Sequence, residues 1–321
     1  MDMFKNELIK GIKIGQSENM EALTGCTVAV CEEGAVCGVD VRGASPGTRE
    51  TDLLDPVNTV QKVNAVVLSG GSAFGLESTC GVARCLEEKG VGFDVAVAKV
   101  PIVTGAILFD LAAGRADIRP DMEMGYEACE KALLGEELKF GNYGAGCGAT
   151  VGKILGMHRA MKSGIGCCKF ELTGGLEVAA IIAVNALGDV FENGEVLAGV
   201  RTEDGEHRMN AKNIAKAGIK VHGFDIGNTT IGIVMTNAKL DKAQCKKISQ
   251  MAHDGMARAI YPIHTPHDGD TIFTMATGEV ECDSDLTILG TLAGDAIEQA
   301  IINAVKNAET AGIFKSFKDM K

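Results

Sequence analysis

A run of β-branched and apolar residues occupies Thr229-Thr230-Ile231-Gly232-Ile233-Val234-Met235-Thr236 and predicts a strand. The pattern after it predicts a helix over about residues 241–260, a second strand over 271–277 and a long helix over 285–308. This strand–helix–strand–helix order, together with the strands expected upstream, predicts an α/β fold in which stacked sheets are flanked by helices.

The part of the chain before residue 229 contains shorter predicted elements. Residues 27–31 and 35–41, split by Glu32-Glu33-Gly34, are interpreted as a hairpin. Residues 177–187 are nearly all apolar, which predicts a strand buried on both faces. Residues 193–216 are polar and are expected to form an exposed linker. Other strands are expected at residues 63–69, 94–97, 106–111 and 167–172, and helices from the loop at 70–75 to residue 89 and at 122–134.

The composition restricts the classes of protein. The chain has 321 residues, which fits one large domain or two small ones, and 46% of them are hydrophobic, which is ample for a buried core. Its 43 acidic and 31 basic residues give a net charge of −12, and because an acidic surface repels phosphates and anionic lipid heads, we expect neither nucleic-acid nor membrane partners. No apolar stretch reaches the roughly 18 residues of a membrane span. The start of the chain lacks the pattern of a signal peptide.

The cysteines point to a reducing compartment. Eleven are scattered along the chain without a Cys-x-x-Cys pair, so the sequence offers no structural zinc site. We therefore expect free thiols and a cytoplasmic protein. Cys147, in a glycine-dense loop at residues 141–153, is interpreted as a small packing residue, and a reactive thiol is the minority alternative.

Thr229 is the first candidate for chemistry. From Gly227-Asn228-Thr229-Thr230 alone, the simpler interpretation is a turn that leads into an edge strand. If the Asn228–Thr229 bond were cut, Thr229 would gain a free α-amine with a pKa near ~8. That amine could accept the proton of the residue's own hydroxyl, so that one residue would supply both nucleophile and base.

Three further polar residues are candidates for chemistry. Asp268 and Asp270 precede the strand at 271–277, and they would form a solvated loop or, if neighbouring strand ends meet, stabilise an ammonium group and orient the nucleophile. Asn185 ends the apolar strand, where it would cap a turn or donate its NH₂ to an oxyanion.

Two glycine loops and the histidines are weaker candidates. Gly70, Gly71 and Ser72 follow a strand and open a helix, a geometry that would present free backbone N–H groups to an anionic or carboxylate ligand. The loop at 141–153 lacks the order of a phosphate-binding loop, because Gly152-Lys153 is followed by Ile154. His253, His264 and His267 are nearest to the acidic pair, and we assign each a structural or solvated role.

Six segments between residues 68 and 277 together resemble one family, the DmpA-type aminopeptidases. This family includes the L-aminopeptidase/D-esterases, the β-aminopeptidases and, closest to this sequence, the nylon-oligomer hydrolases. The segments are Leu68-Ser69-Gly70-Gly71-Ser72-Ala73-Phe74-Gly75-Leu76, Gly144-Ala145-Gly146-Cys147-Gly148-Ala149-Thr150-Val151-Gly152-Lys153, Val184-Asn185-Ala186-Leu187-Gly188, Asn228-Thr229-Thr230-Ile231-Gly232, Met251-Ala252-His253-Asp254-Gly255-Met256-Ala257-Arg258-Ala259-Ile260 and His267-Asp268-Gly269-Asp270-Thr271.

The resemblance implies a fold and a maturation step. The expected fold is a four-layer αββα sandwich of the type found in N-terminal-nucleophile hydrolases, with a different topology. A single domain, residues 1–321, would cleave itself between Asn228 and Thr229 into an α chain, 1–228, and a β chain, 229–321. The two chains would stay together, and members are typically tetramers of such pairs. The substrate would be a small peptide or amide, and neither a metal nor an organic cofactor is needed.

The resemblance also implies roles for five residues. Thr229 matches the nucleophile, and Asp268 and Asp270 match the acidic pair that orients it. Asn185 matches the oxyanion or substrate-positioning amide, and Lys153 matches the site lysine of the nylon-hydrolase branch. The β-aminopeptidase branch has a serine nucleophile and Ser-Gly-Glu in place of the acidic pair, so the resemblance does not extend to β-peptide specificity.

Two other classes of protein remain as alternatives. Ornithine acetyltransferase has a similar architecture and a threonine nucleophile, but its cut normally follows alanine, whereas Asn228 stands here. The other alternative is an unprocessed protein whose glycine loops bind a small acid.

Overall fold

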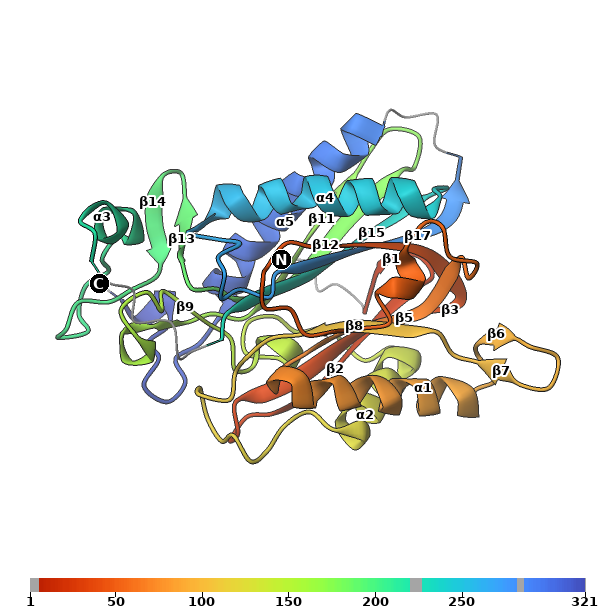
Figure 1. Ribbon diagram of the computed structural model, residues 1–321, viewed down its shortest axis with the longest axis horizontal. Coiled ribbons are helices and arrows are strands. Elements are labelled where there is room, and N and C mark those ends of the chain that lie inside the picture. The colour runs from red at the N-terminus through yellow and green to blue at the C-terminus, as the bar shows by residue number, and fades with distance from the viewer. Residues whose placement is uncertain (1–5, 220–226, 282–285, 321) are drawn as a thin grey trace.

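The computed structural model describes residues 6–219, 227–281 and 286–320 (Figure 1). This part of the chain forms four layers, in which helices cover both outer faces of two packed sheet layers. One outer layer consists of α4 (Lys242–Ala259) and α5 (Leu286–Asn307), and the other of α1 (Ser78–Glu88) and α2 (Met122–Leu134). The predicted αββα sandwich is confirmed.

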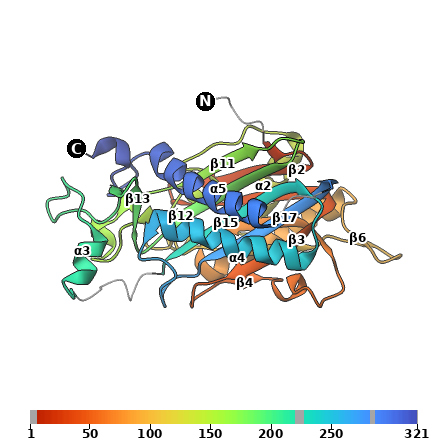
Figure 2. The same ribbon diagram turned by 90° about the horizontal axis from the view of Figure 1, so that it is seen from above.

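The sheet layer beneath α4 and α5 carries the second half of the chain. Its strand order is β11 (Ile165–Glu171), β12 (Glu177–Asn185), β15 (Thr229–Ala238), β17 (Thr271–Val280) and then β3 (Thr24–Val41). β15 and β17 are parallel because α4 connects them by crossing the outer face, whereas the other neighbours are antiparallel. Viewed from above, α4 and α5 lie side by side over these strands (Figure 2).

β3 joins the two sheet layers. Its last residues, Val36 to Val41, pair with β17, and its first residues pair with β2 (Ile12–Asn19). On its other side it pairs with β5 (Lys62–Ser69), with a register break between Val30 and Ala35. The predicted hairpin at 27–41 is therefore wrong. Glu32-Glu33-Gly34 lies at an irregularity within one long strand. The prediction failed because two charged residues followed by a glycine are also typical of a turn.

The second sheet layer packs on α1 and α2. β5 is parallel to β8 (Val103–Ile107), which pairs with β4 (Thr48–Arg49), and β1 (Glu7–Ile9) pairs with β2. α1 follows β5 in the chain and provides the first part of the connection to β8. The strand predicted at residues 106–111 corresponds to β8. The predicted range therefore begins and ends later in the sequence than the observed strand.

The alternation of side chains explains why the layers stack. In β12, Val178, Ala180, Ile182 and Val184 face the core beneath α4 and α5, while Ala179, Ile181 and Ala183 face the core between the sheets. The prediction of a strand buried on both faces is confirmed. Cys26, Val28 and Val67 belong to a third core under α1 and α2.

Helix ends follow the sequence signals. Asp241 accepts from the backbone N–H of Gln244, whose side chain accepts from the backbone N–H of Asp241, so α4 begins with a capping box. α2 begins after Asp121, whose side chain accepts from Met124 N, and ends at Gly135, which is left-handed at φ 76°. Both helices lie where they were predicted.

Two shorter predictions are wrong. Residues 94–97 do not form one strand, because β6 (Phe93–Asp94) and β7 (Lys99–Val100) form a small exposed hairpin around them. The predicted linker at 193–216 contains β14 (Glu195–Ala198) and α3 (Ala211–Lys216), and its buried Ile214 packs in a small core of its own. The remaining strands are β9 (Thr150–Val151), β10 (Met161–Lys162), β13 (Asp189–Glu192) and β16 (Ile260–Tyr261).

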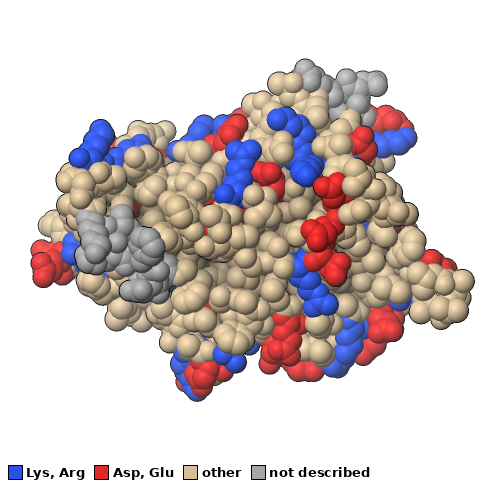
Figure 3. Space-filling view, in the orientation of Figure 1, with Lys and Arg blue, Asp and Glu red and all other residues tan. Residues whose placement is uncertain are grey.

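The surface of the described residues mixes charges of both signs. On the face in Figure 3, basic and acidic side chains alternate, and no continuous basic stripe crosses it. Across residues 6–219, 227–281 and 286–320, none of the helices combines the length and apolarity that crossing a membrane would require.

Candidate active site

Three strand ends bring the predicted site residues together. Thr229 is the first residue of β15 and lies directly opposite Asn185, the last residue of β12. On the other side of β15, Asn228 forms a parallel bridge with Asp268, just before β17 begins at Thr271. Neighbouring strand ends thus bring the acidic pair and Asn185 to Thr229, and the catalytic roles expected of these residues stay predictions.

The Asn228–Thr229 peptide is held by main-chain groups on the β17 side. Asn228 N–H donates to His267 O at 3.3 Å, and the Asn228 carbonyl accepts from Gly269 N–H at 3.0 Å. The Thr229 hydroxyl donates to the same carbonyl oxygen. A Cβ at position 269 would lie 2.9 Å from Thr229 Oγ1, so only glycine leaves room for this hydroxyl. The carbonyl of the predicted cleavage site therefore contacts both a hydroxyl and a backbone donor.

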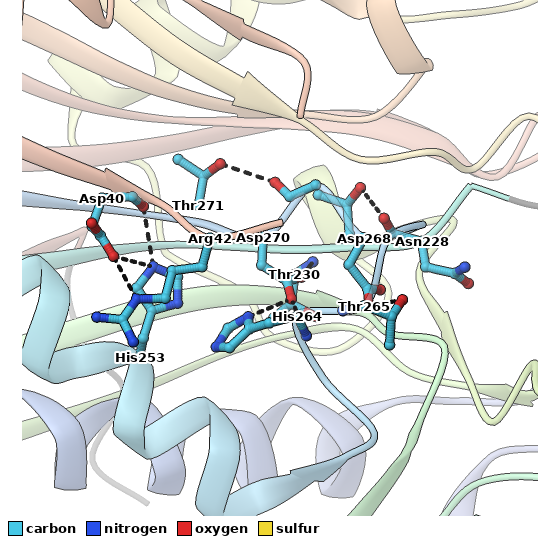
Figure 4. Close-up of polar contacts among 12 residues, drawn as sticks. Asp40, Arg42, Asn228, Thr230, His253, His264, Thr265, Asp268, Asp270 and Thr271 are labelled. Atoms are coloured by element: carbon cyan, nitrogen blue, oxygen red, sulfur yellow. Dashed lines mark hydrogen bonds and ion pairs between the residues drawn. The ribbon is translucent and has the colours of Figure 1, made fainter. Parts of the chain in front are cut away.

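Asp270 binds Thr230, the residue that follows the predicted nucleophile Thr229. Its Oδ1 accepts from Thr230 N–H at 2.8 Å. Its Oδ2 accepts from two nitrogens of His264: the backbone N, at 3.0 Å, and the ring Nδ1, at 2.8 Å (Figure 4). Asp270 is fully buried, so these donors replace the water that a carboxylate would otherwise bind.

Asp268 differs from Asp270 in having one oxygen available. Its Oδ2 accepts from the N–H and the hydroxyl of Thr265, at 2.7 Å and 2.5 Å. Its Oδ1 is buried and has no hydrogen-bond partner within the described residues. Burial, followed by the charge of Asp270, raises the pKa of Asp268 to about 6. A buried carboxylate oxygen without a donor is an acceptor site for an incoming N–H or hydroxyl.

Lys153 and Asn185 form one buried unit. Lys153 Nζ donates to Asn185 Oδ1 at 2.7 Å and to Asn185 O at 3.0 Å. Burial lowers the pKa of Lys153 to about 7, although Asp268, Asp110 and Asp270 oppose the shift. The Asn185 NH₂ donates to Phe109 O at 2.8 Å. This amide is thus oriented by Lys153 and donates to a loop carbonyl.

The Gly70–Ser72 loop does not present free donors. Gly70 N–H donates to Gly25 O, and Ser72 N–H donates to Leu108 O, both at 2.9 Å. Gly71 N–H donates to Asp110 Oδ1 at 2.7 Å. The expectation of free N–H groups here is wrong, because the nearby Asp110 occupies the position that a ligand carboxylate was expected to take. A contact between substrate and these residues stays a prediction.

The second glycine loop is a packing element. A Cβ at Gly148 would lie 2.0 Å from Leu23 O, and one at Gly146 would lie 2.2 Å from Ile165 N, so small residues are required. Burial raises the pKa of Cys147 to about 12, which fits a packing residue and not a reactive thiol. No group of three metal-binding side chains occurs among residues 6–219, 227–281 and 286–320.

The structure adds four groups that the sequence did not identify. His264, to which the sequence assigned a structural or solvated role, contacts Asp270 through its backbone N–H and its Nδ1. Thr265 binds Asp268 from three positions upstream, a spacing typical of a local turn. Gly269 N–H and Asp110 carried no signal, because a backbone donor and a lone aspartate are common everywhere.

Residues 8–317 match the peptidase family S58. The chain belongs to peptidase family S58. It is 37% identical to an uncharacterized aminopeptidase of Mycobacterium bovis, over 97% of this chain and 96% of the relative. It is 29% identical to a 6-aminohexanoate-oligomer endohydrolase of Agromyces sp., over 92% of this chain and 84% of the relative. This S58 chain is therefore a member of a family of hydrolases that act on amide bonds.

Solved structures share the fold of this S58 chain. The L-aminopeptidase D-Ala-esterase/amidase of Ochrobactrum anthropi superimposes with a TM-score of 0.68 at 16% identity, covering 97% of this chain and 90% of that one. A β-aminopeptidase of Burkholderia sp. superimposes with a TM-score of 0.62 at 18% identity, covering 95% and 88%. The Ochrobactrum protein is described as a variant of the Ntn hydrolase fold.

Proposed function

We propose that this S58 protein is a self-processing amidohydrolase or aminopeptidase that cleaves its own Asn228–Thr229 bond and then uses Thr229 as an N-terminal nucleophile. The observation that carries the proposal is the contact of the Asn228 carbonyl with both the Thr229 hydroxyl and Gly269 N–H. The hydroxyl is beside the carbonyl that it would attack, and the N–H is a donor for the oxygen on which charge would develop.

The maturation step rearranges one peptide bond. Thr229 Oγ1 attacks the Asn228 carbonyl carbon, the C–N bond breaks, and the hydroxyl proton ends on the released Thr229 amine. Water then hydrolyses the resulting ester, which leaves the Asn228 carboxylate and the free Thr229 hydroxyl. Because the amine is blocked before cleavage, another base must first accept the hydroxyl proton. Lys153 and Asp268, with pKa values of about 7 and 6, are the candidates at this site.

Turnover repeats the same chemistry on a substrate. Thr229 Oγ1 attacks the substrate carbonyl while the free α-amine accepts its proton, and the amine passes that proton to the leaving nitrogen. Water then attacks the acyl-enzyme ester and releases the acid. In this proposal the Asp268 oxygen that has no partner among the described residues would accept from a donor on Thr229, while Asp270 accepts from the Thr230 N–H.

Lys153 and Asn185 would act together in turnover. Lys153 binds the backbone oxygen and the side-chain oxygen of Asn185. In turnover Lys153 would therefore orient the Asn185 amide as well as provide positive charge. Once cleavage frees Thr229, the Asn185 NH₂ can exchange Phe109 O for the substrate oxyanion. With a pKa of about 7, Lys153 is partly charged at neutral pH, and this charge favours a neutral Thr229 amine.

The names of the relatives indicate the substrate class. One relative is an aminopeptidase and another acts on 6-aminohexanoate oligomers, which are linear amides. We propose short peptides or linear amides as substrates of this chain.

The test is the intact mass of the purified protein and of two variants. We expect the wild type to separate into fragments 1–228 and 229–321 under denaturing conditions. Thr229→Ser keeps a hydroxyl and should still split, whereas Thr229→Ala should stay at 33.5 kDa and hydrolyse no aminoacyl amide. Splitting of Thr229→Ala at the same bond, or activity in an undivided wild type, would disprove the proposal. Acyl transfer to ornithine in preference to water would favour the acetyltransferase alternative.

A further inference from the structure

A chain of buried and half-buried polar groups leads away from Thr229 on the side of α4. It begins at Asp270, continues through His264 and His253, and ends at Asp40 near the end of β3 (Figure 4). The rings of His264 and His253 meet edge to face, with centroids 4.8 Å apart and planes at 72°. The proposed chemistry at Thr229 uses only the first of these four residues.

His253, on α4, lies between His264 and Asp40 in this series of polar groups. Its Nε2 lies 3.1 Å from Asp40 O and therefore carries the proton, because a carbonyl oxygen only accepts. Burial lowers the pKa of His253 to about 4, so the ring is neutral and does not repel His264 at neutral pH. Asp40 is in turn held by Arg42, at 2.7 Å from Nε to Oδ2. A fixed, uncharged ring thus packs against His264.

His264 is held in one orientation by its backbone and its ring. Its φ of 57° lies in the left-handed region, where few residues other than Gly, Asn, Asp and His occur. This conformation directs both its backbone N–H and its Nδ1 to the same oxygen of Asp270, at 3.0 Å and 2.8 Å. The other ring nitrogen is buried without a hydrogen-bond partner in the described part of the chain. The ring therefore has one polar contact, and that contact is Asp270.

We propose that His264 is a positioning residue for the nucleophile: its Nδ1–H fixes the Asp270 carboxylate, which holds the Thr230 backbone and through it the Thr229 hydroxyl. This inference rests on the function proposed above. The inference follows from the different partners of the two Asp270 oxygens. One oxygen binds the Thr230 N–H at 2.8 Å, and the other binds His264. Without the Nδ1 donor, Oδ2 of Asp270 keeps only the backbone N–H of His264, so the carboxylate holds Thr230 less rigidly.

Three substitutions separate the donor from the backbone. His264→Asn tolerates a positive φ and can place its NH₂ where Nδ1 lies, while His264→Gly tolerates the same φ but has no donor. His264→Gln places its NH₂ near the Nε2 position instead. We expect Asn to mature and turn over within a few-fold of the wild type. Gly and Gln should lose about 10- to 100-fold in the rate of maturation and in kcat, with KM nearly unchanged.

A double-mutant cycle and a remote control complete the test. In an Asp270→Asn background, His264→Gly should cause little additional loss, because both act through one carboxylate. His207→Ala, on an exposed loop, should mature like the wild type. Equal behaviour of His264→Asn and His264→Gly, or full additivity with Asp270→Asn, would overturn the proposal. If the wild type itself does not split, the proposed function fails. If the wild type splits and His264→Gly splits equally fast, only the inference about His264 is disproved.

Discussion

At the scale of single residues, two carboxylates of similar sequence context have different surroundings. Asp270 receives donors on both oxygens, from Thr230 and His264, whereas Asp268 has donors on one oxygen only. Asp270 is therefore suited to hold the strand that carries the proposed nucleophile, and Asp268 to receive a proton or bind a new donor.

Asp270→Asn should slow both maturation and turnover. An amide has one oxygen and one NH₂, so either orientation sets N–H groups against the donors of Thr230 or of His264. Loss of hydrogen bonds to a charged group costs about 1.5–3 kcal/mol, or about 10- to 150-fold in rate if the loss is felt in the transition state. The fraction of cleaved chain over time, and kcat on an aminoacyl amide, measure the effect. Wild-type rates for this variant would show that Asp270 has no part in the chemistry.

At the scale of elements, a glycine sets the distance between α4 and the sheet. A Cβ on Gly38 of β3 would lie 2.3 Å from Lys246 N and 2.6 Å from Cys245 C, both in the backbone of α4. The same helix carries His253, whose ring packs edge to face against the ring of His264. Close packing of this helix on β3 is therefore a condition for the geometry next to Asp270.

Gly38→Ala should destabilise the protein by about 1–3 kcal/mol, because the added methyl group must push the backbone of α4 away from the sheet. The measurement is urea unfolding in the Thr229→Ala background, where the chain is expected to stay in one piece. Gly90→Asn is a suitable control: Gly90 has φ 70° and open space around it, and asparagine accepts that conformation. A Gly38→Ala variant as stable as this control would show that α4 can shift without cost.

At the scale of the whole molecule, the predicted cut falls directly before β15, an inner strand of a sheet layer to which both fragments contribute. β12 and β3 belong to fragment 1–228, while β15 and β17, which lie between them, belong to fragment 229–321. α4 and α5 of the second fragment share a core with β12 of the first. Separation of the fragments would expose this core and break two strand pairings at once.

The two fragments should therefore remain associated after cleavage. The buried pairing of β15 with β12 extends from Asn185–Thr229 to Val178–Thr236, and its burial in the sheet makes dissociation as costly as unfolding. Size-exclusion chromatography in native buffer should give one peak that contains both masses, and two species should appear only in denaturant. Separate elution of the fragments in native buffer would contradict this arrangement.

Local sequence patterns identified most helices and the inner strands. The capping signal at Asp241, the apolar run before Asn185 and the β-branched run from Thr229 each depend on neighbours within a few residues, which the sequence displays directly. The same local reasoning failed at Glu32-Glu33-Gly34. A turn and a bulge use similar residues, and only the partner strands distinguish them.

The sequence by itself determined the family resemblance, the four-layer fold that it implies and the choice of Thr229, Asp268, Asp270, Asn185 and Lys153 as site residues. Only the tertiary structure decided which groups meet: Gly269 N–H at the Asn228 carbonyl, His264 at Asp270, and Asp110 at Gly71 in place of a ligand. The physical reason is that hydrogen bonds between distant segments depend on strand register and on the depth of packing. Neither quantity is encoded in any short stretch of residues.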